Sequence, residues 1–375
     1  MYTQFAIRRF RGLNNVALER LSRINLLVGA NGAGKTSFLE ALWLHANPSG
    51  ELVARVDAFR AYAWETPIPG AAMTPWRYLF YGSRANADIE LLGRANGHRW
   101  QVNLRQVSDG YQETPIPALA KSNGSFLASG EGTLAMLLNP LNVSAAAELL
   151  VEVTNKDRPS AEPVRLATLR SSAQGLGLHT QHPLSHADLP GVFAALLSSP
   201  LRYTAEVALR FGVLDRENQG ERILRIARII EPSLRRLAVI PRASGEATLY
   251  ADIGLRELVP LQLMGGGFQS VVAFAVNVAG TRDGIVLVDE IENGVHYSAL
   301  EQLWQGLHLL CEEMNAQIVA TTHSLECVEA ARRALPADAL LVHRFSKRPD
   351  GDSISVRTLD VAALDGAREL GIEVR

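Results

Sequence analysis

Short apolar runs and helix-patterned stretches alternate near both ends of the chain. Ile24 to Val28, Gly284 to Val288 and Gln317 to Ala320 are mostly apolar and too short for helices, which is typical of strands buried in a parallel sheet. Ser37 to Leu44 and Leu325 to Ala334 have the spacing of helices. This pattern predicts an α/β protein built around a parallel sheet.

Alternating patterns further along the chain predict two hairpins. Arg236 to Ile240 and Thr248 to Ile253 alternate or run apolar on either side of a glycine turn. Asp88 to Leu92 and Arg99 to Val107 flank Asn96-Gly97, a dipeptide that favours a tight hairpin turn. We therefore expect a β-subdomain in addition to the parallel sheet.

Stretches rich in Pro, Gly, Ser and Ala lie between these strands. Tyr111 to Pro163 has this composition, with one helical candidate at Val143 to Val153. Ser171 to Pro190 is loop-like, and a polar surface is favoured over a metal site for its three histidines, His179, His182 and His186. This part of the chain is expected to be mixed and partly helical.

The chain is organised as a split core around a long insertion. Residues 1–80 and 235–375 are expected to supply the core, and residues 81–234 an inserted β and helical lobe. After the last core strand we expect a hairpin across Arg348 to Asp352 and a short helix from Val361 to Leu370.

Composition and charge are those of an ordinary globular protein. The 375 residues are 47% hydrophobic and 20% charged, and the formal net charge of −2 means that nucleic acid would have to bind a local basic patch. Cys311 and Cys327 lack the spacing of a metal pair and are expected to be reduced core thiols. Met1 to Arg11 has no apolar segment of a secretion signal, so we expect a cytoplasmic protein.

One uncharged segment has the length of a transmembrane helix. Leu258 to Thr281 contains 24 residues without a charge, but Pro260, three consecutive glycines and several polar residues interrupt it. We interpret it as a strand, a loop and a buried helix, and we expect no membrane association.

A glycine-rich run from Gly29 to Thr36 joins the first apolar run to the helix that follows. In this context glycines turn backbone N–H groups toward an anionic phosphate, and the helix dipole favours the same charge. Lys35 is expected to contact the β- and γ-phosphates, and the Thr36 hydroxyl to bind Mg2+. The predicted cofactors are ATP and Mg2+, bound by Asn31, Gly32, Ala33, Gly34, Lys35, Thr36 and Ser37.

Two acids follow the apolar run that ends at Val288. Asp289 is expected to bind Mg2+, and Glu290 to polarise the attacking water as the catalytic base. Two surface acids after a core strand are the alternative, which the presence of a phosphate loop disfavours.

Two further elements complete the candidate site. Leu263 to Gln269 is a glycine cluster that opens an apolar helix, Ser270 to Ala279, and a helix N-terminus can bind phosphate. The third apolar run continues into His323, whose imidazole is expected near the γ-phosphate. The order along the chain is phosphate loop, glycine-led helix, Asp-Glu strand and His strand.

This order resembles that of the ABC-type ATPases, particularly the branch shared by SMC, RecF and OLD-like proteins. Phe10 to Leu13 is similar to the opening of this family, which implies that Arg11 approaches the nucleotide. Asp289 to His296 resembles the joined Walker B motif and D-loop. The resemblance implies the fold of an ABC-type ATPase head and catalytic roles for Glu290, His323 and Lys35.

The signature motif of this family is matched in part. Leu263, Gly265 and Gly266 agree with it, whereas Met264 and Gly267 stand in place of a serine and a glutamine. The resemblance implies that the backbone of Gly265, Gly266 and Gly267 completes the nucleotide site of a second protomer.

Several features distinguish the chain from larger members of the family. Proline and glycine recur too often along the chain for long sustained heptads, so the coiled-coil arm of SMC proteins is not expected. The 52 residues after His323 are too few for the nuclease domain of OLD proteins. Gln101 and Gln112 are both poorly placed for the Q-loop of ABC transporters. The chain resembles stand-alone bacterial ATPases related to the OLD proteins, many of them found in phage-defence and retron-type systems.

Asn218 to Glu231 is predicted to form a helix with an arginine stripe, Arg222, Arg225 and Arg228. Such a stripe can contact the phosphates of DNA or a partner protein. A solvated helix face paired with neighbouring glutamates is the favoured alternative.

These patterns predict an ATPase that binds Mg-ATP, and the resemblance implies a head-to-tail homodimer around two nucleotides that hydrolyses ATP slowly as a switch. Because no second catalytic cluster is evident, a separately encoded protein effector is expected, in a phage-defence or DNA-related module. A RecF-like DNA-repair clamp, for which DNA is the ligand, and a non-hydrolytic nucleotide-gated scaffold that holds a toxic effector are the alternatives.

Overall fold

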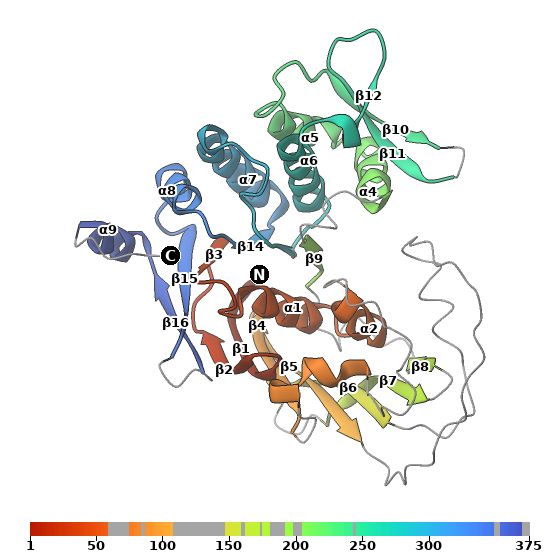
Figure 1. The fold of residues 1–375 in the computed structure, drawn as a ribbon, viewed down its shortest axis with the longest axis vertical. Helices are drawn as coiled ribbons and strands as arrows, with labels where there is room; N and C mark the ends of the chain where they lie inside the picture. Colours follow the sequence, from red (N-terminus) through yellow and green to blue (C-terminus); the bar gives the residue numbers. More distant parts are fainter. Residues whose placement is uncertain are drawn as a thin grey trace. The chain divides into compact units, whose positions relative to one another are not determined.

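The chain forms two compact units (Figure 1). The computed structural model describes residues 1–58, 75–83, 87–107, 147–158, 162–172, 175–180, 192–197, 205–242, 245–348 and 353–369. The first unit comprises Met1–Phe5, Ala17–Trp43 and Val192–Arg375, and the second comprises Ala6–Val16 and Leu44–Gly191. These boundaries differ from the expected ones at residues 80 and 235.

A six-stranded sheet in the order β16-β15-β3-β14-β13-β9 lies at the centre of the first unit. Its strands are β3 (Ile24–Val28), β9 (Ala194–Leu197), β13 (Ile285–Val288), β14 (Gln317–Thr321), β15 (Leu340–Lys347) and β16 (Ile354–Leu359). The neighbours are parallel except β15 and β16, which form the expected C-terminal hairpin. The predicted α/β fold class is therefore confirmed, and β9 is an edge strand that the sequence pattern did not reveal.

Helices cover both faces of this sheet (Figure 1). The helices of the first unit and its borders are α1 (Lys35–Ala46), α4 (Ala205–Arg216), α5 (Gly220–Ala227), α6 (Gly266–Ala279), α7 (Leu300–Met314), α8 (Leu325–Ala334) and α9 (Val361–Glu369). On the α1 face, the ring of Phe38 packs edge-on against Phe345, with 5.5 Å between centroids. On the other face, α6, α7 and α8 share one core with alternate residues of β3, including Leu26 and Val28.

Helix α6 is apolar on nearly all sides because other helices surround it. It contacts α4, α5 and α7, and most of its residues from Phe268 to Ala279 are buried. This explains the long uncharged segment in the sequence. Among the described residues, no helix has both the length and the apolar character needed to cross a bilayer.

A small sheet in the order β10-β11-β12 completes the first unit. Its strands are β10 (Arg236–Pro241), β11 (Ala247–Asp252) and β12 (Val259–Pro260), and β10 pairs with β11 in antiparallel register. The predicted hairpin is confirmed. Val259 and Pro260 are also the strand expected before the glycine cluster.

The sheet of the second unit has the order β2-β1-β4-β5-β6-β7-β8. Its strands are β1 (Tyr2–Phe10), β2 (Leu13–Leu18), β4 (Ile89–Ala95), β5 (His98–Val107), β6 (Ala147–Asn155), β7 (Val164–Ser172) and β8 (Gly175–Thr180). The same unit contains the helix α2 (Gly50–Ala58) and two 3-10 helices, Pro75–Leu79 and Tyr81–Ser83. The predicted hairpin of β4 and β5 is confirmed, with Asn96 and Gly97 at the positive φ values of 51° and 85° that its turn requires.

The helix predicted at Val143 to Val153 is wrong, because residues 147–155 form strand β6. This strand pairs with β5 on one side and β7 on the other. Leu149 and Val151 are buried on one face, but Leu150 and Glu152 on the opposite face are also buried. Burial of both faces removes the alternation by which a strand is recognised in a sequence.

Both cysteines, and His179 of the three loop histidines, lie in the described part of the chain. Cys311 and Cys327 are free and buried, and burial raises the pKa of each thiol to about 12, so both stay protonated. His179 lies in β8, whereas His182 and His186 lie outside the described residues. No cluster of potential metal ligands occurs among the residues that the structure describes.

Two fully buried histidines are held in their neutral form. Nδ1 of His343 lies 3.0 Å from the Thr358 hydroxyl and its Nε2 lies 3.3 Å from Oδ1 of Asn25, while Nε2 of His45 lies 3.0 Å from the Trp100 carbonyl oxygen. Burial lowers the pKa of His343 to about 3 and that of His45 to about 4. Each unit thus contains one histidine that resists protonation while the protein is folded.

These histidines predict that acid destabilises the protein. A depressed pKa in the folded state means that the unfolded chain binds protons first as the pH falls below about 6.5. Each histidine should therefore lower the free energy of unfolding by about 2 kcal/mol between pH 7 and pH 5. Urea unfolding followed across this range would measure the effect.

The variant His343→Gln should be less stable at pH 7 and should lose less stability on acidification than the wild type. His98→Gln is the control, because the His98 side chain is 66% exposed. A pH profile of His343→Gln identical to that of the wild type would contradict this assignment.

Candidate functional site

The predicted catalytic motifs meet at one edge of the parallel sheet. Strands β3, β14 and β13 are adjacent and parallel, so their carboxyl ends lie at the same edge. The glycine loop follows β3, Asp289 follows β13, and His323 follows β14. Segments separated by almost 300 residues in the sequence are thus brought together, as expected for a ligand site in an open α/β sheet.

Glycines give the phosphate loop its shape. Gly29, Gly32 and Gly34 adopt φ values of 134°, 72° and 89°, which side chains with a Cβ rarely tolerate. A Cβ on Gly29 would overlap the Phe345 carbonyl oxygen of β15. Of the other residues predicted to bind nucleotide, Asn31 lies exposed on the loop, whereas Ala33 and Ser37 are buried.

Lys35 lies inside the loop that precedes it. Its Nζ donates to the Gly29 and Ala30 carbonyl oxygens at 2.7 and 3.1 Å. Burial lowers the pKa of Lys35, and the nearby carboxylates of Asp289 and Glu290 partly oppose that shift. The ammonium group therefore lies between the loop carbonyls and the acids, where the phosphates of a nucleotide are expected.

Asp289 joins the three strand ends through hydrogen bonds. The Thr36 hydroxyl lies 3.2 Å from Oδ1 and 3.1 Å from Oδ2 of Asp289, and the Thr321 hydroxyl donates to Oδ1 at 2.6 Å. A carboxylate and a hydroxyl at this separation are oxygen ligands of the kind that Mg2+ prefers. Thr36 and Asp289 therefore fit a magnesium ion bound beside the phosphate loop.

Glu290 has a backbone conformation that few residues with side chains adopt. Its φ is 52°, and its N–H donates to the Thr321 hydroxyl at 2.7 Å. Its carboxylate accepts a short hydrogen bond from the side-chain amide of Asn293. Strained backbone of this kind is often found at functional sites, where the surrounding structure holds it in place.

The loop after β13 is tied to the loop after β14. Oε1 of Glu292 accepts a hydrogen bond from the backbone N–H of His323 at 2.8 Å. Glu292 and Asn293 belong to the motif from Asp289 to His296, but the sequence predicted no role for these two residues. Their position within four residues of Glu290 was the signal that could have placed them in the site.

The glycine cluster at the start of α6 packs against the loop after β13. The Ser270 hydroxyl donates to the Asn293 carbonyl oxygen at 3.2 Å, and a Cβ on Gly267 would overlap the Gly294 carbonyl oxygen. In contrast, nothing lies within 4 Å of a Cβ placed on Gly265 or Gly266. Close backbone packing thus accounts for glycine at position 267, where the family signature has a glutamine.

Arg11 belongs to the second unit. Its Nη2 lies 3.4 Å from the Val56 carbonyl oxygen, and its guanidinium carbon lies 5.7 Å from the centroid of the Phe10 ring. The expected approach of Arg11 to a nucleotide stays a prediction. Gln101 donates to Asn103 at 2.8 Å on the sheet of the same unit, and Gln112 lies outside the described residues.

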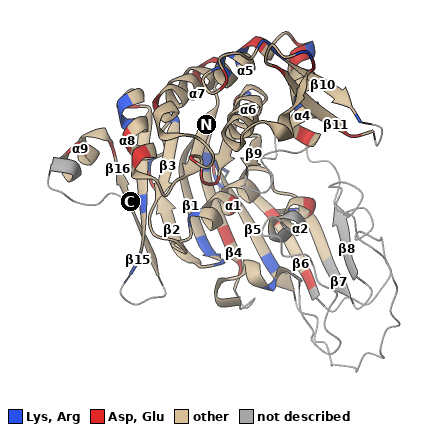
Figure 2. Ribbon diagram, turned by 45° about the horizontal axis from the view of Figure 1, so that its top comes forward, with Lys and Arg blue, Asp and Glu red and all other residues tan. Residues whose placement is uncertain are grey.

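The arginine stripe of α5 is engaged in ion pairs. Arg222 and Arg225 lie 3.2 and 2.8 Å from the carboxylate of Glu313 on α7, and Arg228 lies 2.5 Å from Glu221. Figure 2 shows acidic and basic segments side by side around α5. This agrees with the favoured alternative, a solvated helix face whose charges are paired.

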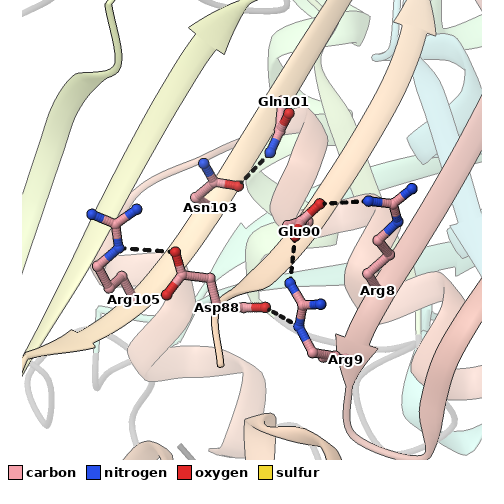
Figure 3. Close-up of polar contacts among 7 residues, drawn as sticks. All are labelled: Arg8, Arg9, Asp88, Glu90, Gln101, Asn103 and Arg105. Atoms are coloured by element: carbon pink, nitrogen blue, oxygen red, sulfur yellow. Dashed lines mark hydrogen bonds and ion pairs between the residues drawn. The ribbon is translucent and has the colours of Figure 1, made fainter. Parts of the chain in front are cut away.

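A second group of arginines, on the sheet of the second unit, is also paired with acids (Figure 3). Arg8 lies 3.1 Å from Glu90, which also pairs with Arg9, and Arg105 lies 2.9 Å from Asp88. Both charge signs are therefore present, and this group does not form a purely basic patch for nucleic acid.

Comparison with known proteins places this site in a family. Residues 24–128 and 181–329, about two thirds of the chain, match the family described as “AAA domain, putative AbiEii toxin, Type IV TA system”. The matched regions include the phosphate loop, the glycine cluster, the two acids after β13 and His323.

Two relatives cover different shares of the chain. An ATP/GTP phosphatase of Helicobacter pylori is 20% identical over 344 residues, 88% of this chain and 87% of that protein. The DNA replication and repair protein RecF of Idiomarina loihiensis is 29% identical over 126 residues, 34% of this chain and 34% of that protein. The chain thus aligns with about a third of the length of this RecF.

Two solved structures share the fold. An SmcHead bound to the C-winged helix domain of ScpA superposes with a TM-score of 0.51 at 12% identity, covering 98% of this chain and 99% of that chain. An Smc head domain with an extended coiled coil, bound to the C-terminal domain of ScpA from Pyrococcus furiosus, gives a TM-score of 0.50 at 11% identity, covering 99% of each chain. The expected ABC-type ATPase head fold is confirmed.

The packing of Gly267 predicts different tolerance at two adjacent glycines. Gly267→Ala should destabilise the protein by about 1–3 kcal/mol, because the new methyl group must displace the loop at Gly294. Gly266→Ala, which has open space around it, should change stability little. Thermal unfolding of both variants measures the difference, and equal stability of the two would show that the contact with Gly294 is not tight.

Proposed function

This chain belongs to the AAA-domain family described above, and from that premise we propose that it binds Mg-ATP and hydrolyses it slowly as a conformational switch. The observation that supports this best is the contact of Thr36 with Asp289, which joins the loop after β3 to the acids after β13. In addition, one relative that aligns with 88% of the chain is an ATP/GTP phosphatase.

Each residue of the site has a role in this proposal. The loop N–H groups and Lys35 bind the phosphates, and Thr36 and Asp289 hold Mg2+, which supplies charge neutralisation at the transferred phosphoryl group. Glu290 accepts a proton from the attacking water, and His323 contacts the γ-phosphate. The Asn293 amide donates to Oε2 of Glu290 and so orients the carboxylate of the proposed base.

Two substitutions separate binding from turnover. Lys35→Ala should abolish nucleotide binding, since it removes the cation inside the loop. Glu290→Gln should keep binding but lower the hydrolysis rate by about 100-fold or more, because an amide cannot accept the proton. Fluorescent nucleotide titration and phosphate release measure the two effects. Turnover by Glu290→Gln at the wild-type rate would show that the base is another residue.

We further propose that two copies assemble head to tail, each covering the other's nucleotide with the start of α6. The helix begins at Gly266, next to an exposed apolar side chain, Leu263, which is 76% accessible. Tyr297, just after the loop that packs on Gly267, is 68% accessible. Exposed apolar side chains beside a proposed nucleotide site are consistent with a surface that a protein covers.

ATP should therefore drive dimerisation of the hydrolysis-deficient Glu290→Gln protein. Adding Gly266→Asp to that protein should prevent the dimer by repelling the γ-phosphate, whereas Gly266→Asn, of similar size but neutral, should weaken it less. A Cβ at position 266 meets no atom within 4 Å, so both substitutions start from an open position. Light scattering with ATP would measure the mass, and dimerisation of the Gly266→Asp protein equal to that of its parent would exclude this composite site.

We propose that the output of the switch is control of a separately encoded protein, in a phage-defence or DNA-related module. The family description names a toxin and a type IV toxin–antitoxin system, and both solved Smc heads carry a bound ScpA domain. The neighbouring genes test this directly, since an adjacent nuclease, toxin or reverse transcriptase would supply the effector.

A RecF-like DNA clamp is the second candidate, because RecF proteins are among the relatives. Because the arginines of α5 are paired with acids, they support DNA binding less than an open basic surface would. ATP turnover with and without DNA separates the two proposals: stimulation by DNA favours the clamp, and unchanged turnover favours a protein-controlled switch. Binding without any turnover favours the non-hydrolytic scaffold.

A further inference from the structure

Strand β15 extends beyond the end of β3 and runs beside the phosphate loop. The two strands are parallel, with Val28, the last residue of β3, opposite Arg344. Three more residues of β15 follow Arg344, and the first of them, Phe345, touches Gly29 through its backbone. The end of β15 therefore lies at the level of the residues that would surround a phosphate.

Alternation along β15 directs every second side chain to the face that carries α1. His343 meets Asn25 of β3, and Phe345 packs against Phe38 of α1. Lys347 is next on this face, and its Nζ lies 3.6 Å from the position that a Cβ on Gly32 would occupy. The ammonium group thus lies directly over the phosphate loop.

Lys347 and the carboxylates of the site lie on opposite sides of the phosphate loop. Strand β15 borders β3 on one side, while β14 and β13, with Asp289 and Glu290, lie on the opposite side. Lys347 is exposed, and no ion pair with an acid is found for it among the described residues. A cation close to a glycine loop and distant from the acids is suited to bind an anion.

We propose that Lys347 is a second phosphate-binding cation, which contacts the phosphate chain of the nucleotide from the side of the loop opposite Asp289 and Glu290. This inference rests on the proposed binding of Mg-ATP. The nucleotide keeps negative charge after Mg2+ binds, so two lysines on either flank of the loop neutralise it better than Lys35 alone. Because the contact is with phosphate, ATP and GTP should depend on Lys347 to the same extent.

The test is the affinity of Lys347→Gln for fluorescent ATP and GTP analogues. We expect about fivefold weaker binding of both, because Lys347 is exposed and its charge is partly screened, and the loss should shrink at high salt. Lys347→Arg should restore most of the affinity. Arg348→Gln is the matched control, since it removes the same charge from the adjacent exposed residue, just after the end of β15.

The affinities of these variants decide whether Lys347 binds phosphate. The proposal is supported if only Lys347→Gln binds more weakly, and by the same factor for both nucleotides. The proposal is overturned if Lys347→Gln binds with wild-type affinity, if Arg348→Gln loses affinity to the same extent, or if the loss is confined to one of the two nucleotides. The proposed function itself fails if the wild-type chain binds no nucleotide or if Lys35→Ala leaves binding intact. These two results do not involve Lys347, so they are distinguishable from a failure of the present proposal.

Discussion

The hydrogen bonds of the Asp289 carboxylate are the interaction on which the site depends. Oxygens from Thr36 and Thr321 meet this carboxylate, and each of the three residues follows or ends a different parallel strand. The same Thr321 hydroxyl accepts the N–H of Glu290 and so helps to hold the strained backbone of that residue. One hydroxyl group thus contacts both the proposed metal ligand and the backbone of the proposed base.

Close contacts between backbones fix the loops around this junction. Gly29 touches β15, and Gly267 touches the loop that carries Gly294, and neither contact leaves space for a Cβ. These contacts place the phosphate loop against β15 and the start of α6 against the loop after β13. The contact at Gly267 also explains why this position holds a glycine, since a side chain there would overlap the Gly294 carbonyl oxygen.

Several arginines outside the site are paired with acids. Arg222 and Arg225 share Glu313, and Arg8 and Arg9 share Glu90, so the described surface of each unit mixes both signs. At the phosphate loop, Lys35 lies near the carboxylates that follow β13, whereas Lys347 lies on the side of β15. Lysines near the glycine loop and carboxylates on one side of it are consistent with a site for an anionic ligand and its cation.

The phosphate loop, the Asp-Glu pair, the glycine-led helix and the parallel core strands could all be predicted, because each is specified by neighbouring residues: glycine content, a continuous apolar run or a helical period. Which residues meet depends on the packing of distant elements. The strand β6 was hidden because both of its faces are buried, and the partner of the α5 arginines lies nearly 90 residues away on α7. The place of Lys347 over Gly32 likewise depends on the pairing of β15 with β3, which brings together residues more than 300 positions apart. Local patterns report the burial of one element, whereas such contacts depend on how distant elements pack.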